Sequence, residues 1–161
     1  MSLKNCFYLL FATISLGIFV SCDSDDDNKV EYPRTIQVGN VTIDGQEVTW
    51  MDFLTPENDT VYIVNSDEEL QQYRRMVADV VLKTDVDYTK NSVLIVGGGA
   101  TSGIDTIRQE YIQSAAEVYN LNIKVSLNEA TEAPTWAQTV VVPKIDSTAV
   151  VGCEVIYIEK K

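Results

Sequence analysis

Residues 97–103 form a glycine-rich segment that can be compared with phosphate-binding loops. Gly98 and Gly103 have the spacing of P-loop glycines, but Ile104 stands where the motif needs the lysine that reaches the β- and γ-phosphates. A dinucleotide-binding turn needs a helix after its glycines, whereas strand formers follow here. The segment is therefore predicted to connect two strands. The candidate binding loop comprises Gly98, Gly99, Ala100, Thr101, Ser102, Gly103 and Ile104.

The chain has no histidine, which excludes catalytic triads and metal sites that depend on imidazole. It also lacks a closely spaced cysteine pair for zinc. Counting does not exclude a pair of glycosidase carboxylates, because acidic residues are abundant, but no long cleft-forming domain accompanies them. We therefore expect no enzymatic activity, no metal and no other cofactor. Trp50 and Trp136 are candidates for stacking on a sugar ring, although a tryptophan in a small β domain more often packs in the core.

Cys22 is the thiol whose surroundings indicate a specific modification. Lys4 precedes an uncharged apolar run over residues 6–20, which is shorter than the roughly 20 residues of a membrane span and typical of an export signal. Residues 19–22, Phe-Val-Ser-Cys, resemble the lipobox of bacterial lipoproteins. That resemblance implies that residues 1–21 are a signal peptide and that Cys22 becomes the lipidated first residue. A signal peptide cleaved elsewhere and an uncleaved anchor are the alternatives.

Acidic residues dominate the segment that follows, and residues 22–34 are predicted to form a disordered tether because like charges repel and bury nothing. An EF-hand loop from Asp23 would require glycine at Asn28 and glutamate at Arg34, so calcium binding is not expected. The run resembles the export signal of Bacteroidetes-type surface lipoproteins, which implies display on the outer face of the outer membrane. A spacer on the periplasmic face is the alternative. The predicted signal residues are Asp23, Ser24, Asp25, Asp26 and Asp27.

The overall charge limits the classes of partner. The 161 residues carry a net charge of −12, and removing residues 1–21 removes Lys4 and no acidic residue, which leaves −13. A surface this acidic argues against nucleic acid, whose phosphates need lysine and arginine. Cys153 would be the cysteine left over in the mature domain. We expect it to be a small buried hydrophobe, with pairing between molecules as the alternative.

The rest of the chain alternates short runs of strand formers with turn signals and contains one helical segment. Asp44-Gly45 is a strong hairpin signal, and a turn is also predicted at Tyr119-Asn120. Ser66 and Glu69 match a capping box that opens a helix over about residues 67–79. Residues 35–161 are thus predicted to form one α+β domain, predominantly antiparallel, with about seven strands and one short helix. The strands expected are a hairpin over 35–50 and runs at 60–64, 92–96, 106–119, 120–127, 138–142 and 154–158.

The order of features from residue 60 to residue 143 carries a family resemblance. A capped helix, a lysine before the apolar run 93–96, the glycine segment, a hairpin and Pro143 follow one another. This order resembles the C-terminal domain family of PrcB, a protease-complex-associated lipoprotein, in which the glycine turn reads Pro-Thr-Gly-Gly-Tyr. Ala100, Ser102 and Ile104 depart from that turn. The resemblance implies a noncatalytic, protein-binding, β-rich domain.

These features lead to one main hypothesis with two alternatives. The chain is expected to be a lipoprotein, held at the outer membrane by the lipid on Cys22, whose domain binds or stabilises another exported protein. The first alternative is glycan capture by Trp50 or Trp136 for a nutrient-uptake system. The second is protease inhibition, with the glycine loop in an active-site cleft. Buried tryptophans and an exposed loop favour protein binding, whereas exposed aromatic faces favour sugar.

We predict that Cys22→Ser abolishes lipid attachment, because a serine hydroxyl cannot form the thioether. Metabolic labelling with a fatty-acid probe measures the attachment, and the variant should carry no label while the parent does. Undiminished labelling of the variant would show that the lipid is attached elsewhere.

Overall fold

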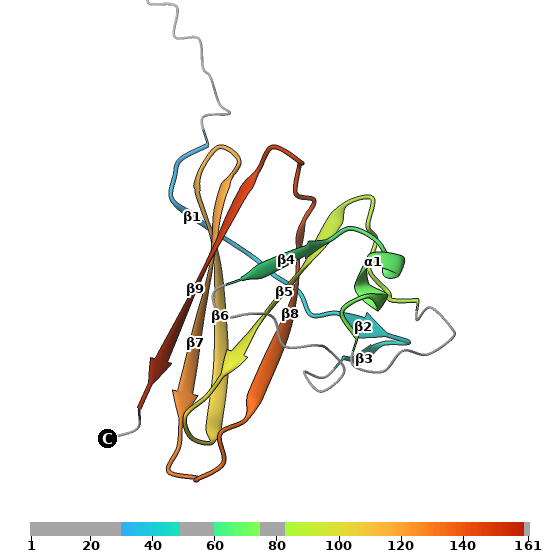
Figure 1. The fold of residues 1–161 in the computed structure, drawn as a ribbon. Helices are drawn as coiled ribbons and strands as arrows, with labels where there is room; N and C mark the ends of the chain where they lie inside the picture. The colour runs from blue at the N-terminus through green and yellow to red at the C-terminus, as the bar shows by residue number, and fades with distance from the viewer. Residues whose placement is uncertain (1–29, 49–59, 75–82, 160–161) are drawn as a thin grey trace, which may run out of the picture. The chain divides into compact units, whose positions relative to one another are not determined.

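A computed structural model describes residues 30–48, 60–74 and 83–159 (Figure 1). The chain divides into two units, residues 1–30 and 31–161, and all the described strands lie in the second. Within the described residues there are nine strands and one short helix, so the β-rich character is confirmed and the expected count of about seven strands is wrong. No described helix is long and apolar enough to cross a membrane.

Sheet A has four strands in the order β1-β6-β7-β9. They are β1 (Arg34–Ile36), β6 (Ile104–Ala115), β7 (Val118–Leu127) and β9 (Val150–Ile158). β6 is antiparallel to both β1 and β7, as expected, but β9 runs parallel to β7. The parallel pair arises because β8 (Thr135–Pro143) intervenes in sequence and lies in the other sheet, so the chain returns to sheet A in the direction of β7.

The turn between β6 and β7 lies earlier than predicted. The prediction placed it at Tyr119-Asn120, but Tyr119 pairs with Gln113 as a strand residue. The chain instead reverses at residues 116 and 117, where Glu117 adopts a φ of 58°. Such a left-handed conformation is compatible with a tight hairpin turn. The β-forming character of Val118 and Tyr119 therefore extends β7 rather than interrupting it.

Sheet B has the order β4-β5-β8, with β4 (Val61–Val64) and β5 (Asn91–Gly99) completing it. β5 is the central strand, and every residue from Ser92 to Gly98 is buried. Leu94 and Val96 belong to the cluster shared with sheet A, whereas Val93 and Ile95 belong to a second cluster on the opposite face. Burial on both faces explains why β5 is a continuous apolar run rather than an alternating one.

A third layer covers the far face of sheet B (Figure 1). It contains the hairpin of β2 (Thr42–Ile43) and β3 (Gln46–Glu47) together with helix α1 (Asp67–Gln71). The predicted Asp44-Gly45 turn is confirmed, with φ values of 52° and 75°. The Asp85 carboxylate fixes this turn by accepting from the Gly45 amide at 2.9 Å and the Thr42 hydroxyl at 2.8 Å. These two donors lower the pKa of Asp85.

The start of α1 agrees with the capping prediction, but its length does not. The Ser66 hydroxyl accepts from the Glu69 amide at 3.2 Å, while the Glu69 carboxylate accepts from the amide of Asn65 instead of that of Ser66. The predicted helix over 67–79 is wrong for residues 72–74, because the Gln72 amide bonds three residues back and tightens the last turn. Residues 75–79 lie outside the described part of the chain.

The predicted hairpin over 35–50 is also only partly correct. β1 belongs to sheet A and pairs with β6, so the hairpin proper spans only β2 and β3. Between these elements, Gly39 and Val141 exchange backbone hydrogen bonds of 2.9 Å at the outer edge of β8. The N-terminal segment therefore covers the edge of sheet B on the side opposite β4.

Candidate functional site

Two connections meet at the end of the sandwich where β5 and β7 finish. Residues 100–103 link β5 to β6, and residues 128–134 link β7 to β8. Three backbone hydrogen bonds join them: Ala100 donates to Pro134 at 2.9 Å, Gly103 donates to Ala130 at 3.0 Å, and Asn128 donates to Gly103 at 2.8 Å. The pair of connections, which we call the loop end, is thus held as one unit on a rigid sheet scaffold.

Gly103 is needed for this close approach. A Cβ atom at this position would lie 2.7 Å from the Ala130 Cβ and still nearer to the Asn128 side-chain oxygen. The Asn128 oxygen is itself engaged, because it accepts from the Ala130 amide at 2.9 Å. Neither neighbour can withdraw without breaking the contacts between the connections. The packing therefore requires glycine at this position.

Gly98 has a different role, inside the core. It lies opposite Trp136 in the antiparallel register of β5 and β8, so both residues face the same side of sheet B. Trp136 belongs to the cluster between the sheets and is only 1% exposed. Because Gly98 has no side chain, β5 leaves space on that face for the Trp136 indole. The Trp136 indole N–H donates to the Tyr157 hydroxyl at 3.2 Å and so joins sheet B to β9.

The burial of Trp136 shows that the predicted sugar contact at this residue is wrong. An indole that is 1% exposed has no open face on which a sugar ring can stack. The expectation that a tryptophan in a small β domain packs in the core describes this residue instead. Trp50, the other candidate for a sugar contact, lies outside the described residues.

The candidate binding loop also needs a correction of its bounds. Gly98 and Gly99 are strand residues at the end of β5, and Ile104 is the first residue of β6, so the connection itself is only residues 100–103. Ala100 and Gly103 are buried, Ser102 is half-buried and Thr101 is exposed. Thr101 and Ser102 are therefore the loop side chains most accessible to a partner.

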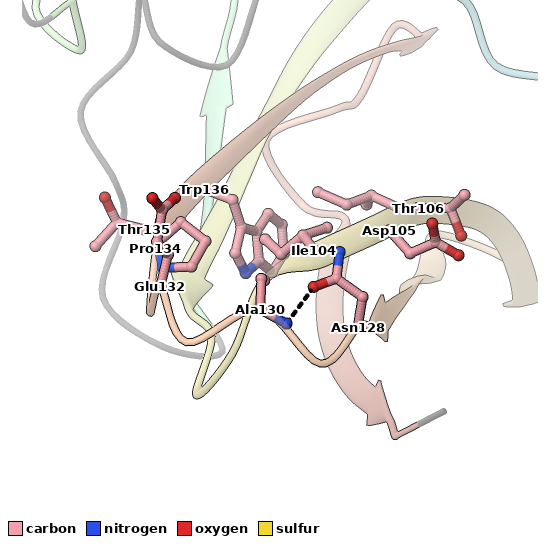
Figure 2. A pocket seen from close by; sticks show the side chains of 11 residues that line it. Ile104, Asp105, Thr106, Asn128, Ala130, Glu132, Pro134, Thr135 and Trp136 are labelled. Carbon is pink, nitrogen blue, oxygen red and sulfur yellow. Dashed lines mark hydrogen bonds between the residues drawn. The ribbon is translucent and has the colours of Figure 1, made fainter. Parts of the chain in front are cut away.

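A depression of about 530 Å³ lies beside this connection (Figure 2). In Figure 2 the carboxylates of Asp105 and Glu132 lie on opposite sides of Trp136, with Ile104 next to the indole. Both acidic residues are exposed, and Pro134 contributes apolar surface. The lining of the depression thus includes the apolar side chains of Ile104 and Pro134 and the acidic side chains of Asp105 and Glu132, a combination suited to an aliphatic or basic side chain.

The contribution of residues 128–134 was not predicted from the sequence. The segment reads Asn-Glu-Ala-Thr-Glu-Ala-Pro, and its polar composition and proline are ordinary loop signals. Nothing in a single sequence indicates that it would meet the glycine segment, because that contact depends on the order of strands in two sheets. The register of β5 with β8 brings the two connections together.

Other predicted site residues fall elsewhere. Cys22 and the export-signal residues Asp23, Ser24, Asp25, Asp26 and Asp27 lie outside the described residues. Cys153, expected to be buried, is half-buried and packs against the cluster between the sheets. Within the described residues, no three acidic, cysteine or histidine side chains gather as a metal-binding group.

Comparisons of the chain with protein-family models, with curated proteins and with solved structures found no match. The resemblance to the PrcB C-terminal domain therefore stays a prediction. The function has to be inferred from the geometry of the described residues together with the sequence.

We predict opposite outcomes for alanine at two neighbouring glycines. Gly103→Ala should lower the free energy of unfolding by about 1–3 kcal/mol, the range for overpacking a tight site. Gly99→Ala is the matched control, because a Cβ there meets nothing within 4 Å, and its effect should stay within about 1 kcal/mol. Denaturant midpoints measure both. Equal midpoints for the two variants would show that the connections do not pack as described.

Proposed function

We propose that this chain is a lipid-anchored surface lipoprotein whose β-rich domain binds another exported protein without catalysing a reaction. The observation that carries the proposal is the preorganised loop end, in which three backbone hydrogen bonds fix two connections against each other. A surface whose loops are already ordered loses little conformational entropy when a partner binds. The lipid on Cys22 and display at the cell surface enter the proposal from the sequence alone.

The size and character of the depression support a protein partner. Its volume of about 530 Å³ is in the range of binding pockets, and it is bordered by the exposed side chains of Asp105 and Glu132. A lysine or arginine side chain has an apolar stem and a cationic end, so it matches the apolar and the acidic side chains of the lining. The net charge of −13 that remains once residues 1–21 are removed would further attract a basic partner surface.

The accessible hydroxyls of the loop allow a direct test. Thr101→Ala combined with Ser102→Ala removes two polar groups with little core volume, so the free energy of unfolding should stay within about 1 kcal/mol of the parent. If the loop end binds the partner, capture from native membranes by the tagged protein should fall. Quantitative mass spectrometry of the captured proteins measures the change.

The matched control is Ser147→Ala combined with Thr148→Ala. These two residues are also adjacent, exposed hydroxyl residues, but they lie between β8 and β9, at the other end of β7 from residues 128–134. Capture by this variant should equal that of the parent. Unchanged capture by a stably folded Thr101/Ser102 variant would reject the loop hydroxyls as partner contacts.

A further inference from the structure

The outer face of sheet A carries two cationic side chains next to each other. The odd-numbered residues of β7, such as Leu121 and Ile123, pack in the core between the sheets, so the even-numbered ones point outward. Arg108 of β6 lies directly opposite Lys124 of β7 in the antiparallel register, and both are exposed. The Cβ atoms of residues directly opposite lie about 4.5–5.5 Å apart, and like charges in such a pair destabilise the sheet.

The chain does not pair these cations with its own acidic groups, although it has 24 acidic residues and only 12 basic ones. Glu110 and Glu154 occupy the next row on the same face, on either side of Asn122. In the described part of the chain, however, the one ion pair within 4 Å joins Lys90 to Asp87. The two opposed cations on sheet A therefore remain available to a ligand.

A depression of about 370 Å³ lies at this row, and its lining includes Arg108, Glu110, Asn122 and Lys124. Guanidinium, ammonium and side-chain amide groups all supply hydrogen-bond donors. The Glu110 carboxylate accepts from the Thr35 hydroxyl at 3.5 Å, and β1, which carries Thr35, lies on the side of β6 away from β7. The lining between β6 and β7 is therefore rich in donors, which suits an anion.

The acidic residues nearby limit the charge that such an anion can carry. A group with several negative charges would be repelled by Glu110 and Glu154 in the next row and by the net negative charge of the chain. A single carboxylate carries one charge, and it matches the planar fork of the Arg108 guanidinium, which can donate two parallel hydrogen bonds to it. The row is thus best suited to one carboxylate.

Apolar side chains beside the cations indicate which kind of molecule supplies the carboxylate. Ile156 lies opposite Lys124, and Ile158 lies one row further along β9. These two isoleucines point to the same outer face and are 39% and 46% exposed. Within the described strands β6, β7 and β9, no outward-pointing residue is aromatic, so a sugar ring would find no ring to stack on. An aliphatic flank suits a polypeptide instead.

We propose that the Arg108–Lys124 pair binds a glutamate or aspartate side chain of another protein, while an aliphatic side chain of the same segment packs on Ile156 and Ile158. Residues i and i+2 of an extended segment lie on one face about 6.5 Å apart, close to the roughly 7 Å that one and a half strand spacings give from the middle of the pair to β9. This inference rests on the proposed function of protein binding. It assigns a second surface, because no residue of this depression lines the one beside the loop end.

The test uses the protein expressed from the full chain and purified in micelles of a non-ionic detergent, with three peptides. The first is acetyl-Ser-Glu-Thr-Leu-Ser-amide, the second has glutamine in place of glutamate, and the third has alanine in place of leucine. The first should shift the nuclear magnetic resonance signals of residues 108, 122, 124 and 156. The glutamine peptide should bind about two- to fivefold more weakly, the range for one exposed charge pair. The alanine peptide should also bind more weakly than the first.

A charge-removing variant locates the carboxylate. Arg108→Gln combined with Lys124→Gln should bind the glutamate and glutamine peptides equally. Its denaturant midpoint should not fall, because the variant removes a repulsion between like charges. Lys83→Gln combined with Lys90→Gln is the matched control, since both lysines are exposed, lie outside every strand and make the same change in net charge. The control should keep the preference of the parent for glutamate.

Several outcomes would overturn the inference. Equal binding of the glutamate and glutamine peptides by the parent would show that the pair does not select a carboxylate, and equal binding of the alanine peptide would remove the aliphatic contact. A lower midpoint in the Arg108/Lys124 variant would show that the pair stabilises the sheet, which removes the reason to expect a ligand. If free glucuronate shifted the same signals at lower concentrations than the glutamate peptide, the pair would be assigned to an acidic sugar. Because capture by the Thr101/Ser102 variant tests the loop end separately, either surface can fail without the other.

Discussion

The burial of β5 on both faces is the constraint on which the rest of the structure depends. Even-numbered residues such as Leu94 and Val96 pack toward sheet A, and odd-numbered residues such as Val93 and Ile95 pack toward the third layer. A strand in this position can bear almost no polar side chain, since an unsatisfied polar group there would be costly. Ser92 is the exception, and its hydroxyl is satisfied by donating to Asn65 at 2.7 Å and accepting from the Ile145 amide at 3.1 Å.

The same constraint explains the glycines at the end of β5. The strand continues through Gly97, Gly98 and Gly99 while Trp136 occupies the space between the sheets opposite Gly98. The chain can then turn immediately into sheet A, which brings residues 100–103 against residues 128–134. The loop end is therefore a consequence of core packing, and its preorganisation does not depend on a partner. The Trp136 bond to Tyr157 extends this packing to β9.

The sequence predicted local features well where one interaction decides them. The Asp44-Gly45 turn and the Ser66 cap depend on a few adjacent residues, and both are confirmed. The apolar strands of both sheets were also found, because period-two patterns and continuous apolar runs are set by burial. The helix end at Gln71 and the reversal at Glu117 were missed, because strand formers and helical spacing continue past both points in the sequence.

A single sequence could not predict which distant strands pair with one another. The assignment of β1 to sheet A, the parallel pairing of β9 and the covering of β8 by Gly39 all depend on which strands become neighbours. For that reason the candidate loop was given bounds that were too wide, and residues 128–134 were not connected with it.

Residue-resolved amide hydrogen exchange of the full-length protein tests the central role of β5 most directly. If β5 is the doubly buried centre of the fold, the amides of residues 93–96 should exchange only through global unfolding, so their protection should match the total free energy of unfolding. The amides of Glu31 and Tyr32, exposed residues that precede β1, should exchange orders of magnitude faster. Exchange of residues 93–96 as fast as that of Glu31 and Tyr32, under conditions in which the protein remains folded, would contradict the account.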